Sequence, residues 1–413
     1  MKKVFPILFL VSFFFNTNAQ ENQFLVSSEF IASYTTDQLD SLWKENSIKQ
    51  IIAPVNYAVD VYEIIYNSRW HDGSTIKASG FYFLPQNPEE KLATMIMNHG
   101  TELRKEQKHS IRGLQAVCTA FATDGYAALY PHYIGLGKGD SSHLYQMNDS
   151  EAYSNIDMLR AVREFNQEND VVTNNQLFIT GYSQGGHATM AAHKMIQEEY
   201  YNEFTVTASA PMSGAYDMTG VQSDVMFEPY DYQGYLPYLL LSVEKQYDVW
   251  DGDIYEIFKP EYRDIIKEKV VNGEHGLRGV SDLLPEIPAD MIIDSLVNEF
   301  VNNPDFVFNE KLALNNNYDW KPETPMRLCY CDADEQVSYK NAFVALDAMK
   351  ANGAENVKLI NGGKKYGHNK CALFTSIYAK FFFDSIRDGK EKGRKGPIFK
   401  RFLVSLAKMA VKP

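Results

Sequence analysis

The stretch Leu177-Phe178-Ile179-Thr180-Gly181-Tyr182-Ser183-Gln184-Gly185-Gly186-His187-Ala188 decides how the rest of the chain is interpreted. Its apolar first half predicts a buried strand, and the small residues after the serine predict a helix. Glycines two positions to either side of Ser183 let the strand and helix approach closely and hold the serine in a strained turn. The pattern predicts a nucleophilic Ser183 and an oxyanion-binding backbone N–H at Gln184. The alternative is a glycine-rich turn in which the serine only caps the helix.

Strands and helices alternate on both sides of this stretch. A short helix is predicted around Asp37–Asn46, and alternating residues from Tyr57 to Leu84 predict a hairpin that turns at 71–74. Further strands are predicted at Ala93–Asn98, Tyr126–Pro131, Phe204–Ala210, Met326–Cys331 and Val357–Ile360, and further helices at Ile111–Thr123, Ser150–Glu168, Tyr339–Asn352 and Cys371–Ile386. This alternation predicts the α/β class, with a mostly parallel sheet covered by helices on both faces.

The alternation stops between Asp217 and Trp320. This span shows no clear strand and is dominated by aromatic helical segments at Tyr235–Val249, Tyr262–Val271 and Ala289–Asn302. Its 21 acidic and 7 basic residues give −14, which accounts for the whole net charge of −13. We interpret residues 217–320 as a helical cap inserted before the last strands, over the sheet edge where ligands bind in open α/β sheets. A separately folding domain is the alternative. Residues 20–216 and 321–388 are then the two parts of the core.

The N-terminus predicts a signal peptide over residues 1–19. Lys2 and Lys3 precede an apolar run from Val4 to Phe15 that is too short to span a bilayer comfortably, and Ala19 stands at a plausible cleavage point. A single N-terminal anchor is the alternative. The expected location is therefore secreted or periplasmic.

The C-terminus is basic. Asp384 to Pro413 contain 9 basic and 3 acidic residues, and Ile398–Met409 has the pattern of an amphipathic helix. For the tail at 389–413, packing on the acidic cap or simple solvation is preferred over weak contact with a membrane surface. The acidic net charge argues against a nucleic-acid partner.

An acid and a histidine follow Ser183 in the order that a serine hydrolase needs. Asp332 and Asp334 come just after the strand Met326–Cys331, and His368 comes after the strand Val357–Ile360. Serine is a weak nucleophile unless an imidazole takes its proton and a carboxylate orients that imidazole. We prefer Asp334 as the acid and keep Asp332 as the alternative. No metal-ligand spacing stands out, and no cofactor is predicted.

The cysteines and the other histidines have plainer interpretations. Cys329 and Cys331 share one face of a predicted strand and are not expected to bond each other. A Cys331–Cys371 disulfide is one hypothesis, but buried thiols are the preferred expectation. His187, on the helix after the serine, is expected to be a packing or surface residue. His99 is expected to shape the oxyanion loop rather than to act as a base.

These motifs together resemble the α/β-hydrolases. Within them, the chain is similar to the secretory lipase family, the fungal lipase A type and its bacterial relatives, over roughly 57–384. The matching segments are Asn98–Thr101, Pro131–Gly137, Gly181–Ala188, Asp334–Val337 and His368. The resemblance implies a catalytic triad of Ser183, Asp334 and His368 and an oxyanion hole from Gln184 and a residue near Thr101. It further implies hydrolysis of carboxylic esters through an acyl-enzyme. His132 departs from the family, whose members usually carry an acidic residue there.

Two other functions remain open from the sequence. A serine peptidase uses the same triad, although nothing here suggests the additional domains that such peptidases often carry. A hydrolase-like binding protein with a dead site is the second, and the intact serine, acid and histidine argue against it. The expected partner is a small-molecule or lipid ester, and the sequence predicts no oligomeric state.

Overall fold

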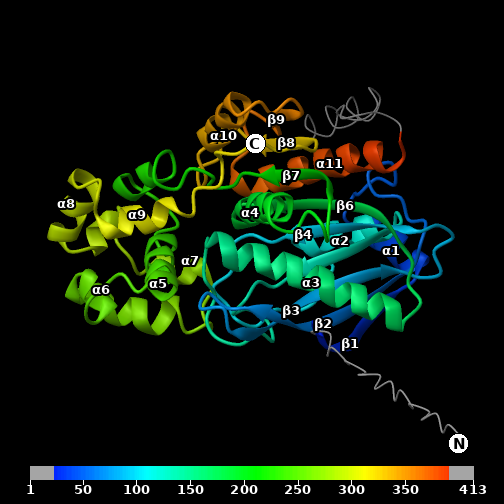
Figure 1. Ribbon diagram of the computed structural model, residues 1–413, viewed down its shortest axis with the longest axis horizontal. Coiled ribbons are helices and arrows are strands. Elements are labelled where there is room, and N and C mark those ends of the chain that lie inside the picture. The colour runs from blue at the N-terminus through cyan, green and yellow to red at the C-terminus, as the bar shows by residue number, and fades with distance from the viewer. Residues whose placement is uncertain (1–22, 390–413) are drawn as a thin grey trace, which may run out of the picture.

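One sheet organises the molecule. The computed structural model describes residues 23–389, so the predicted signal peptide and the tail beyond 389 lie outside the described residues (Figure 1). The strands are β1 (Leu25–Tyr34), β2 (Val59–Arg69), β3 (Thr75–Pro85), β4 (Leu92–Asn98), β5 (Tyr126–Pro131), β6 (Thr173–Tyr182), β7 (Val206–Met212), β8 (Met326–Tyr330) and β9 (Val357–Asn361). They form a nine-stranded sheet in the order β1-β2-β3-β5-β4-β6-β7-β8-β9. The pairs β1–β2, β2–β3 and β3–β5 are antiparallel. The remaining neighbours, from β5 and β4 through β6, β7, β8 and β9, pair in parallel. The predicted fold class is confirmed.

Helices cover both faces of this sheet. The core helices are α1 (Thr36–Glu45), α2 (Gly113–Ala122), α3 (Asn148–Glu168), α4 (Gln184–Glu198), α10 (Lys340–Ala351) and α11 (His368–Arg387). Alternate residues of β6 face opposite sides, as a pleated strand requires. Leu177 and Ile179 join the apolar cluster that contains α3 and α4, whereas Phe178 and Tyr182 join the cluster that contains α2 and α11.

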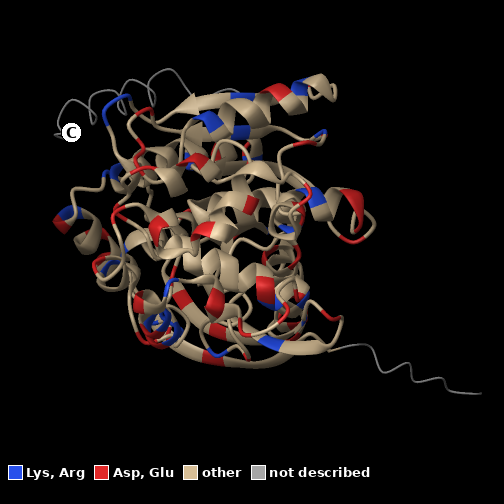
Figure 2. Ribbon diagram, turned by 90° about the vertical axis from the view of Figure 1, so that its left-hand side faces the viewer, with Lys and Arg blue, Asp and Glu red and all other residues tan. Residues whose placement is uncertain are grey.

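A helical insert stands between β7 and β8. Its elements are η1 (Ser223–Phe227), α5 (Tyr235–Tyr247), η2 (Ile254–Ile257), α6 (Pro260–Ile265), η3 (Ile266–Val270), α7 (Leu277–Ser281), η4 (Pro288–Met291), α8 (Asp294–Asn302) and α9 (Val307–Ala313). It lies to one side of the sheet in Figure 1, and its apolar residues continue the same cluster as α3 and α4. Figure 2 looks onto this side and shows acidic residues, in red, spread along its ribbon. We call this segment the cap.

The sequence missed the first strand. In the residues before the hairpin, only a helix near Asp37–Asn46 was predicted. This helix is α1, and Thr35 and Gln38 form a capping box at its N-terminus. Strand β1 precedes it and pairs antiparallel with β2 at the edge of the sheet. Most of its residues are exposed, including Phe30 at 56%. A strand that is mostly exposed lacks the alternation of apolar and polar residues that marks a half-buried strand. Only the pairing with β2 therefore identifies β1 as a strand.

Candidate active site

The turn between β6 and α4 holds Ser183 in an unusual backbone conformation. Its φ of 62° and ψ of −123° lie outside the regions that non-glycine residues commonly adopt. The Ser183 N–H donates to the carbonyl of Met212 on β7 at 3.0 Å, and its carbonyl accepts from Gly186 N–H at 2.8 Å. Neighbouring backbone therefore fixes the turn from both sides.

Two glycines make this turn possible by removing side chains where backbones meet. A Cβ on Gly181 would lie 2.2 Å from the carbonyl oxygen of Gly185, and one on Gly185 would lie 2.1 Å from that of Asn98. Both distances are far inside van der Waals contact. The Gly-x-Ser-x-Gly spacing is therefore required by the close approach of β4, β6 and α4, and the strain at Ser183 follows from that packing.

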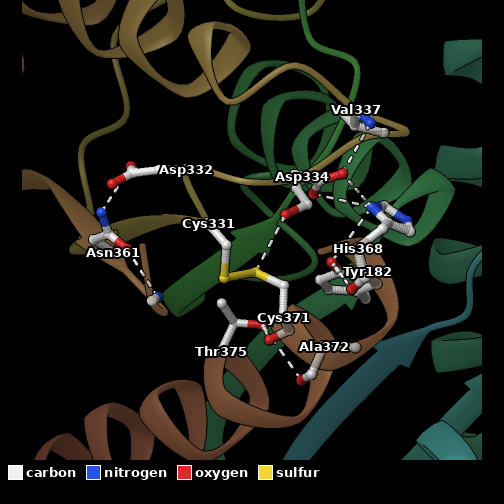
Figure 3. The surroundings of a disulfide bond; sticks show 12 residues. Tyr182, Cys331, Asp332, Asp334, Val337, Asn361, His368, Cys371, Ala372 and Thr375 are labelled. Carbon is white, nitrogen blue, oxygen red and sulfur yellow. Dashed lines mark hydrogen bonds and ion pairs between the residues drawn. A yellow bond between two sulfur atoms is a disulfide. The ribbon is translucent and has the colours of Figure 1, made fainter. Parts of the chain in front are cut away.

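Asp334 and His368 form a hydrogen-bonded pair at the same edge of the sheet (Figure 3). The Nδ1 of His368 lies 2.8 Å from Oδ1 and 2.9 Å from Oδ2 of Asp334, and both side chains are at least 95% buried. The backbone N–H groups of Gln336 and Val337 also donate to Asp334 Oδ1, at 3.1 and 3.0 Å. Because Asp334 accepts from two backbone N–H groups and its oxygens face Nδ1 of His368, the imidazole carries a proton on Nδ1.

The alternative acid faces elsewhere. Asp332 Oδ1 accepts from the side chain of Asn361 at 2.8 Å, and Figure 3 shows it pointing away from the imidazole. Tyr182, the residue before Ser183, contacts the imidazole directly, with ring centroids 4.8 Å apart. Its hydroxyl also donates to the backbone carbonyl of His368 at 2.5 Å. The structure thus brings Asp334 and His368 together next to the serine turn, and leaves Asp332 outside.

Gln184 and the loop that carries Thr101 both lie next to Ser183. Gln184 is the first residue of α4, and the first N–H groups of a helix have no acceptor within the helix. The loop after β4 approaches from the other direction, since a Cβ on Gly100 would lie 3.6 Å from the Cβ of Ser183. Thr101 follows, and its hydroxyl donates to that of Tyr145 at 3.2 Å.

Ser183 opens onto a largely apolar cavity beneath the cap. The cavity comprises about 790 Å³ free of protein atoms, part of which is open to solvent. Its walls carry aliphatic and aromatic side chains, among them Met218, Met226, Tyr230, Tyr232, Tyr235, Leu236, Leu239, Leu240, Phe300 and Leu312. The hydroxyls of Tyr230 and Tyr235 donate to the backbone and side-chain oxygens of Gln336, two residues after Asp334. The cap and the loop that carries Asp334 are therefore linked at the cavity wall.

The remaining histidines near this edge are buried and serve as hydrogen-bonding groups. Burial lowers the pKa of His132 and of His143 to about 3, so both rings are neutral near pH 7. His132 forms a hydrogen bond with the hydroxyl of Ser79 through Nδ1 at 3.0 Å. His187 is fully buried and pairs with Glu151 at 2.7 Å. Sequence reasoning missed Glu151, because an acidic residue in the first turn of a helix is ordinarily a surface residue.

The preferred expectation that Cys331 and Cys371 are buried thiols was wrong. The two are joined by a disulfide, whereas Cys118 and Cys329 are buried and not disulfide-bonded. Helix α11 begins at His368, earlier than the predicted Cys371, so Cys371 lies in its first turn and faces the end of β8. Their Cα atoms are 5.9 Å apart, within the range for a disulfide. The bond ties together the segments that carry Asp334 and His368 (Figure 3).

Two features are absent from residues 23–389. Within that range no cluster of three or more His, Cys, Asp or Glu side chains is arranged to hold a metal ion. Nor does any helix of the same range have the length and apolarity needed to cross a membrane.

Comparison with solved structures identifies the class of protein. The rice cell wall degrading esterase LipA from Xanthomonas oryzae superimposes with a TM-score of 0.81 at 26% identity, covering 90% of this chain and 100% of LipA. Lipase A from Candida antarctica superimposes with a TM-score of 0.68 at 13% identity, covering 90% of this chain and 83% of the lipase, which is a likeness of fold. The chain has the α/β-hydrolase fold of these enzymes.

The particular family follows from the sequence. The family model of the secretory lipases matches residues 114–368, which is more than half of the 413 residues, and the chain belongs to this family. A search of curated proteins found no significant match. Membership and the LipA likeness together identify a carboxylic ester hydrolase.

We predict that loss of the Cys331–Cys371 disulfide lowers the free energy of unfolding by roughly 2–4 kcal/mol, because the bond restricts a long loop in the unfolded chain. Replacing both cysteines by alanine and measuring urea unfolding tests this. A reductant is expected to shift the midpoint of the native protein and to leave the double variant unchanged. Equal midpoints for the two proteins without reductant would contradict the prediction.

Proposed function

We propose that this protein is a secreted serine hydrolase that cleaves carboxylic esters through an acyl-enzyme intermediate. The observation that carries the proposal is the Asp334–His368 pair standing beside a strained serine turn that opens onto an apolar cavity. Secretion is supported by the predicted signal peptide at 1–19 and by a disulfide of the kind that persists in oxidising compartments.

In the proposed mechanism, His368 acts as the base. With Nδ1 held by Asp334, Nε2 carries the lone pair that takes the proton of Ser183 as its oxygen attacks the ester carbonyl. The tetrahedral oxyanion is stabilised by the backbone N–H of Gln184 and by an N–H near Thr101. The imidazolium then returns its proton to the leaving alcohol. Water attacks the acyl-enzyme by the same route and releases the acid.

The cavity beneath the cap is proposed to hold the apolar part of the ester. Ser183 is one of its lining residues, so an acyl group bonded to the serine oxygen starts within the cavity. The tyrosine hydroxyls at 230 and 235 are engaged by Gln336, which leaves mainly carbon surface for contact. Burial of each additional methylene stabilises a complex by about 0.8 kcal/mol.

Replacing the nucleophile tests the proposal directly. Ser183→Ala is expected to lower kcat for p-nitrophenyl butyrate by at least about 10⁴-fold, because the substitution removes the oxygen that forms the acyl-enzyme. The fold should be retained, with unchanged circular dichroism. Turnover by the folded variant at the native rate would refute the serine mechanism.

A matched pair of variants tests the choice of acid. Asp334→Asn is expected to lower kcat by roughly 10⁴-fold, because an amide no longer holds the imidazole in the required tautomer. Asp332→Asn is expected to stay within about twofold of the native kcat, since Asp332 bonds Asn361 rather than His368. Steady-state kinetics of the two purified variants decides the matter. The reverse order of effects would move the role to Asp332.

A second matched pair tests the cavity as the acyl site. Leu239→Trp fills the cavity and is expected to lower kcat/KM for p-nitrophenyl octanoate about tenfold relative to the acetate. Val301→Trp, on an exposed cap position (58%), is expected to leave the ratio unchanged. The ratio of the two ester activities is the measurement. If both variants keep the native ratio, the acyl chain binds elsewhere.

A further inference from the structure

A buried polar cluster lies behind the serine turn and joins three parts of the chain. Glu151 comes from α3, Gln184 and His187 come from α4, and His143 comes from the loop after β5. Glu151 and His187 are fully buried. The Oε1 of Glu151 accepts from the side-chain nitrogen of Gln184 at 2.8 Å, and its Oε2 lies 2.7 Å from Nδ1 of His187.

The hydrogen-bond partners fix the orientation of the Gln184 amide. His143 Nδ1 lies 3.0 Å from the carbonyl oxygen of Ile134, which only accepts, so the proton of this neutral ring is on Nδ1. The other ring nitrogen, Nε2, is then an acceptor and lies 2.7 Å from the Gln184 side chain. Gln184 must therefore present its NH₂ group, with one hydrogen for His143 and one for Glu151.

Both ring nitrogens of His187 lie next to oxygen atoms. Its Nε2 lies 3.0 Å from the carbonyl oxygen of Asn315, so Nε2 carries a proton. Its Nδ1 faces one carboxylate oxygen of Glu151, whose other oxygen accepts from Gln184. His187 therefore has an oxygen atom within hydrogen-bonding distance of each ring nitrogen, which is the arrangement that a doubly protonated ring requires. A fully buried carboxylate also requires such a paired charge.

The cluster further connects the cap to the nucleophile helix. Asn315 and Asn317 lie in the segment that returns from α9 to β8. The side-chain nitrogen of Asn317 donates to the backbone carbonyl of His187 at 3.1 Å, and His187 donates in turn to Asn315. The first turn of α4 is thus held from α3, from the loop after β5 and from the exit of the cap.

We propose that Glu151 and His187 form a buried ion pair that positions the oxyanion hole. It holds the side chain of Gln184, and thereby the peptide N–H that follows Ser183, in the place where the oxyanion forms. The inference rests on the proposed function, since it assigns a task within that reaction. An oxyanion donor acts mainly in the transition state, so its displacement lowers kcat and leaves substrate binding unchanged.

The kinetic test uses two glutamates of the same helix. Glu151→Gln keeps the size of the side chain and removes the charge. It is expected to lower kcat for p-nitrophenyl butyrate by about 10- to 100-fold, with KM within about twofold. The control is Glu164→Gln, because Glu164 also lies on α3 and accepts from the backbone N–H groups of Phe24 and Leu25, remote from Ser183 in the fold. The control is expected to keep the native kcat.

A spectroscopic test uses the native protein and needs no reaction. In ¹⁵N-histidine-labelled protein, His187 is expected to show both ring nitrogens protonated at neutral pH, with the signal assigned by its loss in His187→Gln. A neutral His187, or a folded Glu151→Gln variant with native kcat, would overturn the proposal. If Ser183→Ala is inactive in the same assay, that outcome rejects only the positioning role. If Ser183→Ala is active, the proposed function fails instead.

Discussion

The close approach of three backbones at the end of β6 is the constraint on which the site depends. Side chains at Gly181 and Gly185 would collide with the carbonyls of Gly185 and Asn98, so only glycine allows β4, β6 and α4 to meet there. That packing forces Ser183 to a positive φ and turns it out at the edge of the sheet. Parallel pairing of β6 through β9 then brings the loops after β8 and β9 to the same edge.

Covalent and polar ties hold the parts that the chain brings together. The disulfide joins the end of β8 to the first turn of α11, so Asp334 and His368 sit on segments linked by a bond. The cap is linked to the loop that carries Asp334 through Gln336, and to α4 through Asn317. Apolar residues of the cap belong to the same buried cluster as those of α3 and α4. The cap therefore forms part of the hydrophobic core and also covers the cavity.

Buried strands were the part of the fold most readily predicted from sequence. Strand β5 was placed at its observed bounds, and β4 to within one residue, because a strand covered on both faces is a nearly continuous apolar run. Strand β1 was missed because its exposed residues carry no such pattern. The predicted helix at Ala289–Asn302 is divided into η4 and α8, since backbone at Ile292 bridges to Phe258 instead of continuing the helix. Only tertiary contacts specify that break.

For the site, chain order indicated the serine, the acid and the histidine. The choice between the two aspartates, the disulfide and the role of Glu151 required the tertiary contacts. Asp332 and Asp334 are alike in sequence and differ only in what they face. The Cys331–Cys371 disulfide was not settled by the sequence, because α11 begins at His368 rather than at the predicted Cys371. That earlier start places Cys371 in the first turn of the helix. Glu151 carries no sequence signal, because both of its side-chain partners, Gln184 and His187, come from another helix, α4.

Covalent labelling by a fluorophosphonate tests the central claim most directly, because the reagent reports an activated serine without assuming a substrate. Peptide mass mapping of the labelled native protein locates the adduct. The account predicts one adduct, on the peptide that contains Ser183, and protection by an ester substrate. An adduct on a different residue, or an active esterase that the reagent fails to label, would contradict it.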